Sequence, residues 1–148
     1  MKVVSIAISK SKGTRKGTVP EAELVTEFGI RGDAHAGKWH RQVSFLASES
    51  IAEAKEKGLD VSFGDFAENI ATAGIDWRKI KLGTQLQIGS HARVQVTQIG
   101  KKCHRKCDIF YQAGDCIMPK EGIFARVIKG GIIHSEDPIR IIKSPDGG

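Results

Sequence analysis

The chain has 148 residues, which fits a single domain over residues 1–148 that buries a hydrophobic core without needing disulfides or a structural metal. Hydrophobic residues make up 40% and charged residues 27%, as in ordinary soluble proteins, and no apolar run approaches the roughly 20 residues that span a bilayer. Lys and Arg together number 23 against 17 Asp and Glu, and the net charge of +6 indicates either an anionic partner or, for the scattered lysines, a solvated surface that is simply basic.

Three further features of the sequence restrict the expected cellular compartment and the expected class of partner. The N-terminal stretch MKVVSIAISK is too short and too soon polar for a secretory signal, so we expect a cytoplasmic protein. An odd count of 3 cysteines in a reducing compartment argues against a disulfide framework. Aromatic residues make up only 6% and the basic clusters are short, which makes nucleic acid an unlikely partner and favours a small anionic ligand.

In the first half of the chain, β-branched residues and apolar alternation predict three strands, at residues 3–9, 21–29 and 42–47. Glycine-broken polar stretches predict a basic loop over residues 10–20 and a long loop over residues 29–41. The clearest helix covers residues 48–58, with Ser48 as its N-cap and Gly58 as its stop signal.

The second half predicts more strands. A short strand is expected at residues 69–72, and the alternating stretch 83–100 predicts a hairpin that turns at GSHA. Residues 122–131 and 137–143 predict the closing strands. Many short strands with one or two helices indicate a mostly β domain, either barrel-like or sandwich-like, and no internal repeat is present.

The loop GIRGDAHAGKWHRQVS carries more polar side chains than a connection needs, namely Arg31, Asp33, His35, His40 and Arg41. Its glycines would let backbone N–H groups approach a ligand closely, so one interpretation is a cradle for an anion or cofactor. The plainer interpretation is a turn at the aspartate with solvated histidines. A metal bound by the aspartate and the first histidine is a third, and one such pair is weak evidence for it.

The segment QIGKKCHRKCDIF, residues 98–110, places cysteines among basic side chains. A structural zinc is one interpretation, but only one short Cys pair is present. Buried inert cysteines are a second, and this suits Cys116, which has apolar neighbours. A reactive thiolate is the third. Lys101, Lys102 and Arg105 favour the ionised, nucleophilic form of Cys103.

Six motifs occur in an order that resembles MOSC domains, which are named for the C-terminal domain of molybdenum cofactor sulfurases. They are GIRGDAHAG, RQVSFL, GDFAENI, LGTQLQIG, VQVTQIGKKC and GIFARVIKGG. The resemblance implies a β-rich, barrel-like fold with a strongly mixed sheet, binding of the molybdenum cofactor, an anionic pterin phosphate, and sulfur chemistry at a cysteine. The cysteine at the family position is Cys103. The family loop falls on Asp33 and His35, and its Arg-Gln pair on Arg41 and Gln42.

On this basis we expect Cys103 to ligate molybdenum or to carry persulfide sulfur. The side chains expected to bind or surround the cofactor are Arg31, Asp33, His35, Arg41, Gln42, Asn69, Lys101, Lys102 and Arg105. No pyridoxal phosphate site is visible in this chain, so the expected partners are a separate sulfur donor protein and a molybdoenzyme. Whether the protein is a sulfur transferase acting on the cofactor, a non-catalytic cofactor carrier or a small zinc-stabilised module stays open at this point.

Overall fold

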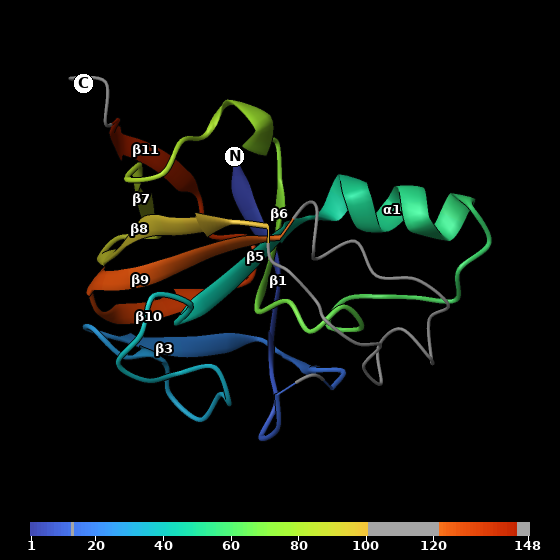
Figure 1. Ribbon diagram of the computed structural model, residues 1–148, viewed down its shortest axis with the longest axis horizontal. Helices are drawn as coiled ribbons and strands as arrows, with labels where there is room; N and C mark the ends of the chain where they lie inside the picture. The colour runs from blue at the N-terminus through green and yellow to red at the C-terminus, as the bar shows by residue number, and fades with distance from the viewer. Residues whose placement is uncertain (13, 101–121, 145–148) are drawn as a thin grey trace.

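An eight-stranded mixed sheet dominates the computed structural model, which describes residues 1–12, 14–100 and 122–144 (Figure 1). Its strands are β1 (Lys2–Ile8), β2 (Gly17–Val19), β5 (Val43–Ala47), β6 (Ile70–Ala73), β7 (Gln85–Ile88), β8 (Ala92–Ile99), β9 (Ile123–Lys129) and β11 (Ile139–Lys143). They are ordered β11-β7-β8-β9-β5-β6-β1-β2. β5 and β6 pair in parallel, and the other pairs in this sheet are antiparallel.

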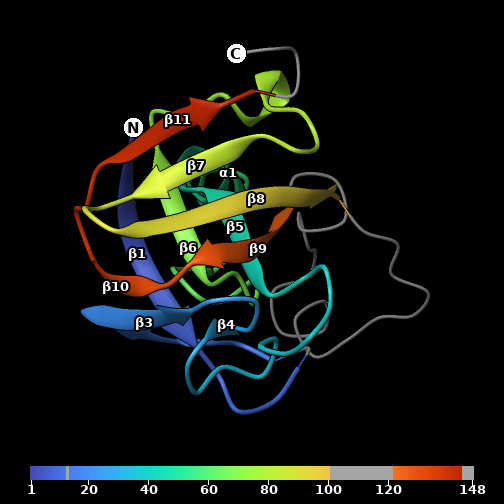
Figure 2. The same ribbon diagram turned by 90° about the vertical axis from the view of Figure 1, so that its left-hand side faces the viewer.

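The sheet curls until β11, at one edge, meets β1, which is next to the strand at the other edge. The Val3 N–H donates to the Asp137 carbonyl at 2.8 Å, and the Ile139 N–H donates to the Met1 carbonyl at 2.9 Å. These bonds join β1 to the start of β11 and give the barrel-like arrangement seen in Figure 2. A second, three-stranded sheet has the order β10 (Gly131–His134), β3 (Glu21–Val25) and β4 (Gly29–Ile30). The expected mostly β fold is therefore confirmed.

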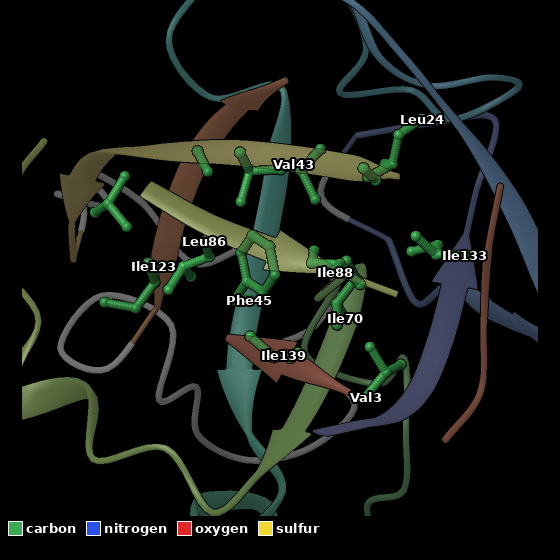
Figure 3. Close-up of a cluster of buried hydrophobic side chains, with 14 of the residues drawn as sticks. Val3, Leu24, Val43, Phe45, Ile70, Leu86, Ile88, Ile123, Ile133 and Ile139 are labelled. Carbon is green, nitrogen blue, oxygen red and sulfur yellow. The ribbon is translucent and has the colours of Figure 1, made fainter. Parts of the chain in front are cut away.

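The main core lies inside the curled sheet. Figure 3 shows Phe45, Ile70, Leu86 and Ile123 converging there, each at most 2% exposed. A smaller cluster, which includes Leu46 and Phe124, packs between the outer face of the sheet and helix α1 (Ser48–Glu56). Because both faces of β5 are covered, its residues 43–46 are all buried instead of alternating between buried and exposed.

The structure confirms the predicted strands at residues 3–9, 42–47, 69–72 and 137–143 and the hairpin over 83–100, each within a few residues. The strand predicted at residues 21–29 is right only in its first half, because β3 ends at Val25 and the chain turns back to pair with it as β4. Gly58, with φ of +95°, follows the helix as predicted. The N-cap assignment is wrong. Ala47, in an extended conformation, precedes the helix, and Ser48 is its first residue and provides no side-chain cap.

Three other boundaries differ from the prediction. The basic stretch 10–20 includes the three-residue strand β2. The predicted strand 122–131 divides into β9 and β10 at Gly130, where a Cβ atom would collide with the Leu24 carbonyl oxygen. The short 3-10 helix η1 (Trp77–Lys79) was not predicted, and it begins where Asp76 accepts the Arg78 N–H. No helix within residues 1–12, 14–100 and 122–144 is long and apolar enough to cross a membrane.

A buried carboxyl group organises the turn before β6. Glu68 is 1% exposed, and its two carboxyl oxygens accept the Gly64 N–H at 2.6 Å and the Phe66 N–H at 3.1 Å. The turn approaches the basic loop closely, since the Lys16 N–H donates to the Gly64 carbonyl at 2.8 Å. Burial raises the pKa of Glu68 to about 7, even though the two N–H donors favour the charged form.

This burial predicts a pH-dependent stability. Because the folded protein keeps a proton that the unfolded chain releases, the free energy of unfolding should fall as pH rises from about 4.5 to about 7. A shift of this size corresponds to a loss of about 3 kcal/mol at most. Urea unfolding at about pH 5 and about pH 8 measures it, and Glu68→Gln should remove most of the difference. If Glu68→Gln keeps the same pH dependence as the exposed control Glu56→Gln, the assignment to Glu68 is wrong.

Candidate functional site

The polar loop over residues 31–42 lies against the C-terminal end of β8. The Thr97 hydroxyl donates to the His40 carbonyl, and His40 Nε2 lies 2.7 Å from Gln98 Oε1. On its other side, the Ala34 N–H donates to the Ser9 carbonyl at 2.8 Å, just after β1. Contacts to two distant strands therefore fix this loop, although it has no regular secondary structure.

A buried ion pair fixes the first half of the loop. Lys16 Nζ lies 2.8 Å from Asp33 Oδ1, and both side chains are fully buried. The Asp33 carboxylate also accepts the N–H groups of Ser9 and His35, each at 3.0 Å. Burial alone would raise the pKa of Asp33, but the neighbouring His35 ring, the Lys16 ammonium and the Ser9 N–H outweigh it and hold that pKa well below its usual range. Asp33 is thus an ionised residue that positions the loop.

Sequence reasoning missed Lys16. It is one of several basic residues in the stretch KSKGTRKG, and nothing in that pattern separates the buried lysine from its exposed neighbours. The ion pair can be recognised only in three dimensions, because the Lys16 ammonium meets a carboxylate that is 17 residues further along the chain.

His35 presents an available ring nitrogen. Its Nδ1 atom is buried and has no hydrogen-bond partner among the described residues. The distance of 3.7 Å to Asp33 Oδ2 is too long for a hydrogen bond. The ring is parallel to the Trp39 indole with centroids 6.4 Å apart, and the Trp39 Nε1–H donates to the His35 carbonyl at 2.7 Å. These contacts fix the ring and leave Nδ1 for a ligand or a water molecule.

Arg41 presents a second unpartnered nitrogen. Its guanidinium carbon lies 4.6 Å from the centroid of Trp39 and 5.8 Å from that of Phe124, and the Lys12 ammonium lies 4.4 Å from the Trp39 centroid. The Arg41 Nε atom is buried and, within the described part of the chain, bonds to no acceptor. Cation–π contacts attract the charge but provide no acceptor for an N–H group. We call Lys12, His35, Trp39 and Arg41 the cationic loop cluster.

The other predicted ligand residues have different surroundings. Arg31 is exposed and its Nε lies 2.7 Å from Glu23 Oε1. Gln42 is buried and its Oε1 accepts the Val127 N–H at 2.9 Å. Asn69 is buried, with Oδ1 accepting the Ser44 N–H at 3.0 Å and Nδ2 donating to the Ala7 carbonyl at 3.1 Å. The structure thus gathers Asp33, His35 and Arg41, whereas the side chains of Gln42 and Asn69 hold strands together.

The cysteine segment lies outside the described residues, and so do the predictions made for Lys101, Lys102, Cys103 and Arg105. The residues that flank it are placed, because the Gly100 N–H donates to the Gly122 carbonyl at 2.6 Å. Gly100 follows directly on the end of β8 that contacts the polar loop. In the part of the chain that the structure describes, no group of three or more His, Cys, Asp or Glu side chains is arranged to hold a metal ion.

Solved structures with the same fold include three bacterial proteins. The YuaD protein from Bacillus subtilis has a TM-score of 0.77 at 19% identity, and 93% of each chain is covered. YiiM from Geobacillus stearothermophilus has a TM-score of 0.73 at 21% identity, with 96% of this chain and 75% of that chain covered. YiiM from Escherichia coli has a TM-score of 0.68 at 23% identity, with 97% and 70% covered. At these identities the similarity establishes the fold.

The family follows from the sequence itself. Among curated proteins, no sequence matches this chain. The model of the MOSC domain family matches residues 32–140, which contain Asp33, His35 and Arg41 of the polar loop and the sheet from β5 to β11. The match covers well over half of the chain, and this protein belongs to the MOSC domain family.

Proposed function

We propose that this MOSC protein binds the molybdenum cofactor, or a related anionic molybdenum species, at the cationic loop cluster, and that Cys103 carries sulfur or ligates molybdenum there. The observation that supports this most is the pair of buried nitrogens without a partner, Arg41 Nε and His35 Nδ1. The bound cofactor would supply the molybdenum centre and the anionic groups. In this proposal the protein acts in the cytoplasm.

The cluster fits an anion for physical reasons. A buried N–H group without an acceptor costs roughly 1–3 kcal/mol, and an oxyanion removes that cost. The Arg41 guanidinium would donate to phosphate or molybdate oxygens, since its planar fork suits such groups, and Lys12 would add a compact positive charge. With its proton on Nδ1, His35 would donate a further hydrogen bond from a ring already fixed by Trp39.

The role proposed for Cys103 rests on its sequence context and on its short distance along the chain from β8. Cys103 follows Gly100 by three residues, so the covalent chain keeps its Cα atom within about 11 Å of the Gly100 Cα atom. Lys101, Lys102 and Arg105 in its sequence favour the thiolate. A thiolate can attack the outer sulfur of a donor persulfide while the donor thiolate leaves, which moves one sulfur atom without net oxidation. The donor would be a separate protein, and the recipient would be the cofactor of a molybdoenzyme.

A non-catalytic carrier is a second candidate, and the state of Asp33 favours it. Because Lys16 pairs with Asp33 at 2.8 Å in a fully buried site, that carboxylate is not free to exchange protons with a ligand. The loop therefore binds and orients more than it performs acid–base chemistry. Mass spectrometry of the cofactor after incubation separates the two functions, because a carrier returns it unchanged and a transferase returns it with an altered sulfur content.

Replacing Arg41 tests the anion site. Arg41→Ala should weaken binding of the molybdenum cofactor about ten- to a hundredfold, because a charge-assisted hydrogen bond is lost. Thermal melting should show a folded domain. Arg93→Ala removes the same charge from an exposed position near the other end of β8 and is the matched control. Equal affinities of the two variants in a calorimetric titration would place the site elsewhere.

The reactivity of Cys103 tests its assignment. If cations stabilise its thiolate, the rate of alkylation should rise with a midpoint below the ordinary thiol pKa of about 8.5, and salt should raise that midpoint. Peptide mapping assigns the label and distinguishes Cys103 from Cys107 and from Cys116, which we expect to react later. A chelator should have no effect. Reactivity that appears only after chelation would instead support the zinc-stabilised module.

A further inference from the structure

A cavity separate from the cationic loop cluster lies where α1 begins and β8 ends, two segments that meet near the centre of Figure 1. Its volume is about 650 Å³, within the range of small-molecule sites. Its lining comes from four parts of the chain and consists of Ala47, Glu49, Ser50, Glu53, Gly74, Ile75, Asp76, Trp77, Arg78, Ile99 and Ile123. We propose that this cavity binds a small organic cation, an aliphatic amine.

The polar half of the cavity is negatively charged. The charged groups that line the cavity are three carboxylates, those of Glu49, Glu53 and Asp76, and one guanidinium, that of Arg78. Arg78 Nε lies 2.9 Å from Asp76 Oδ1, so the charge of this guanidinium is paired with the Asp76 carboxylate and not with the two glutamates. Glu49 Oε2 accepts the Gly74 N–H at 2.9 Å. The Glu53 carboxylate has no hydrogen bond or ion pair with any described residue, although the backbone carbonyl of Glu53 accepts the Lys57 N–H within the helix cap.

Helix geometry brings the two glutamates together. Glu49 and Glu53 are four residues apart in α1 and therefore share one face of the helix. Like charges at this spacing destabilise a helix, and a cation between them reverses the sign of the interaction. This negative site belongs to a chain whose net charge is +6, so it attracts a ligand of the opposite charge from the one expected at the cationic loop cluster.

The other half of the cavity is apolar. Ile99 is 47% exposed at the end of β8 and pairs with Ile123 of β9, and Trp77 also lines the cavity; Ile123 and Trp77 are 2% and 8% exposed. A hydrocarbon stem can cover Ile99 while its ammonium group reaches the glutamates, as lysine stems do on protein surfaces. A metal ion fits less well, because the described residues contain no group of three or more ligating side chains arranged to hold one. An amine with an aliphatic stem matches both halves.

Calorimetry with 1,5-diaminopentane tests the proposal, with 1,5-pentanediol as the uncharged probe of equal length. The wild type should bind the diamine saturably at one site and should not bind the diol. Glu53→Gln should weaken diamine binding at least tenfold. Glu56→Gln, which removes the same charge from α1 outside the cavity lining, should change it less than twofold. Ile99→Ser should weaken binding several-fold, whereas Ile132→Ser, at a residue 55% exposed on β10, should not.

Three results would overturn the proposal. Equal losses in Glu53→Gln and Glu56→Gln would show diffuse attraction to the helix instead of a site. Binding of the diol as tightly as the diamine would remove the role of charge, and a linear titration without saturation would remove the site altogether. The outcome is independent of the proposed cofactor function, because Glu53→Gln should leave cofactor binding unchanged and Arg41→Ala should leave diamine binding unchanged.

Discussion

The buried ion pair between Lys16 and Asp33 is the contact on which the arrangement of the polar loop depends. It joins the basic loop after β1 to the loop that precedes β5, two segments that no strand pairing connects. Removing one partner of such a pair leaves an uncompensated buried charge, which typically costs about 3–5 kcal/mol. The first half of the loop, including the position of His35, therefore depends on a lysine that itself contacts no ligand in our proposal, while Thr97 and Gln98 hold the second half.

A division of roles within the loop follows from this ion pair. The Asp33 carboxylate accepts hydrogen bonds from Lys16 and from two backbone N–H groups. Arg41 and His35, in contrast, each have a buried nitrogen without a partner among the described residues. The Lys12 and Arg41 side chains lie close to the Trp39 ring, which attracts their charges but provides no hydrogen-bond acceptor for them. Donors that are fixed, buried and unpaired are what an oxyanion requires, and the contacts to Thr97 and Gln98 place them beside the strand that leads to Cys103.

Local sequence pattern predicted most of the fold and part of the site. The hairpin over residues 83–100 and the helix after residue 47 follow from alternation and from a glycine stop, which are properties of a few neighbouring residues. The three-residue strand β2 lies in a basic, glycine-containing stretch with no alternation, so only its pairing with β1 defines it.

Only those site residues that stand close together in the sequence could be predicted. Asp33, His35 and Arg41 stand within one motif and were found, whereas Lys16 was not. The contacts of Gln42 and Asn69 depend on β5 lying between β9 and β6. The order of strands in a sheet cannot be predicted from the local sequence of any one segment. The resemblance to MOSC domains supplied the family, and the structure added which donors are free.

The most direct measurement is a titration with molybdate followed through the arginine side-chain Nε–H resonances in a ¹⁵N–¹H correlation spectrum, with the Arg41 signal assigned from its loss in Arg41→Lys. The account predicts that the Arg41 Nε–H resonance shifts saturably, that the His35 ring nitrogens shift with the same midpoint, and that the Arg93 resonance stays in place. Molybdate binding that leaves the Arg41 resonance unmoved, or no binding at all, would contradict the account.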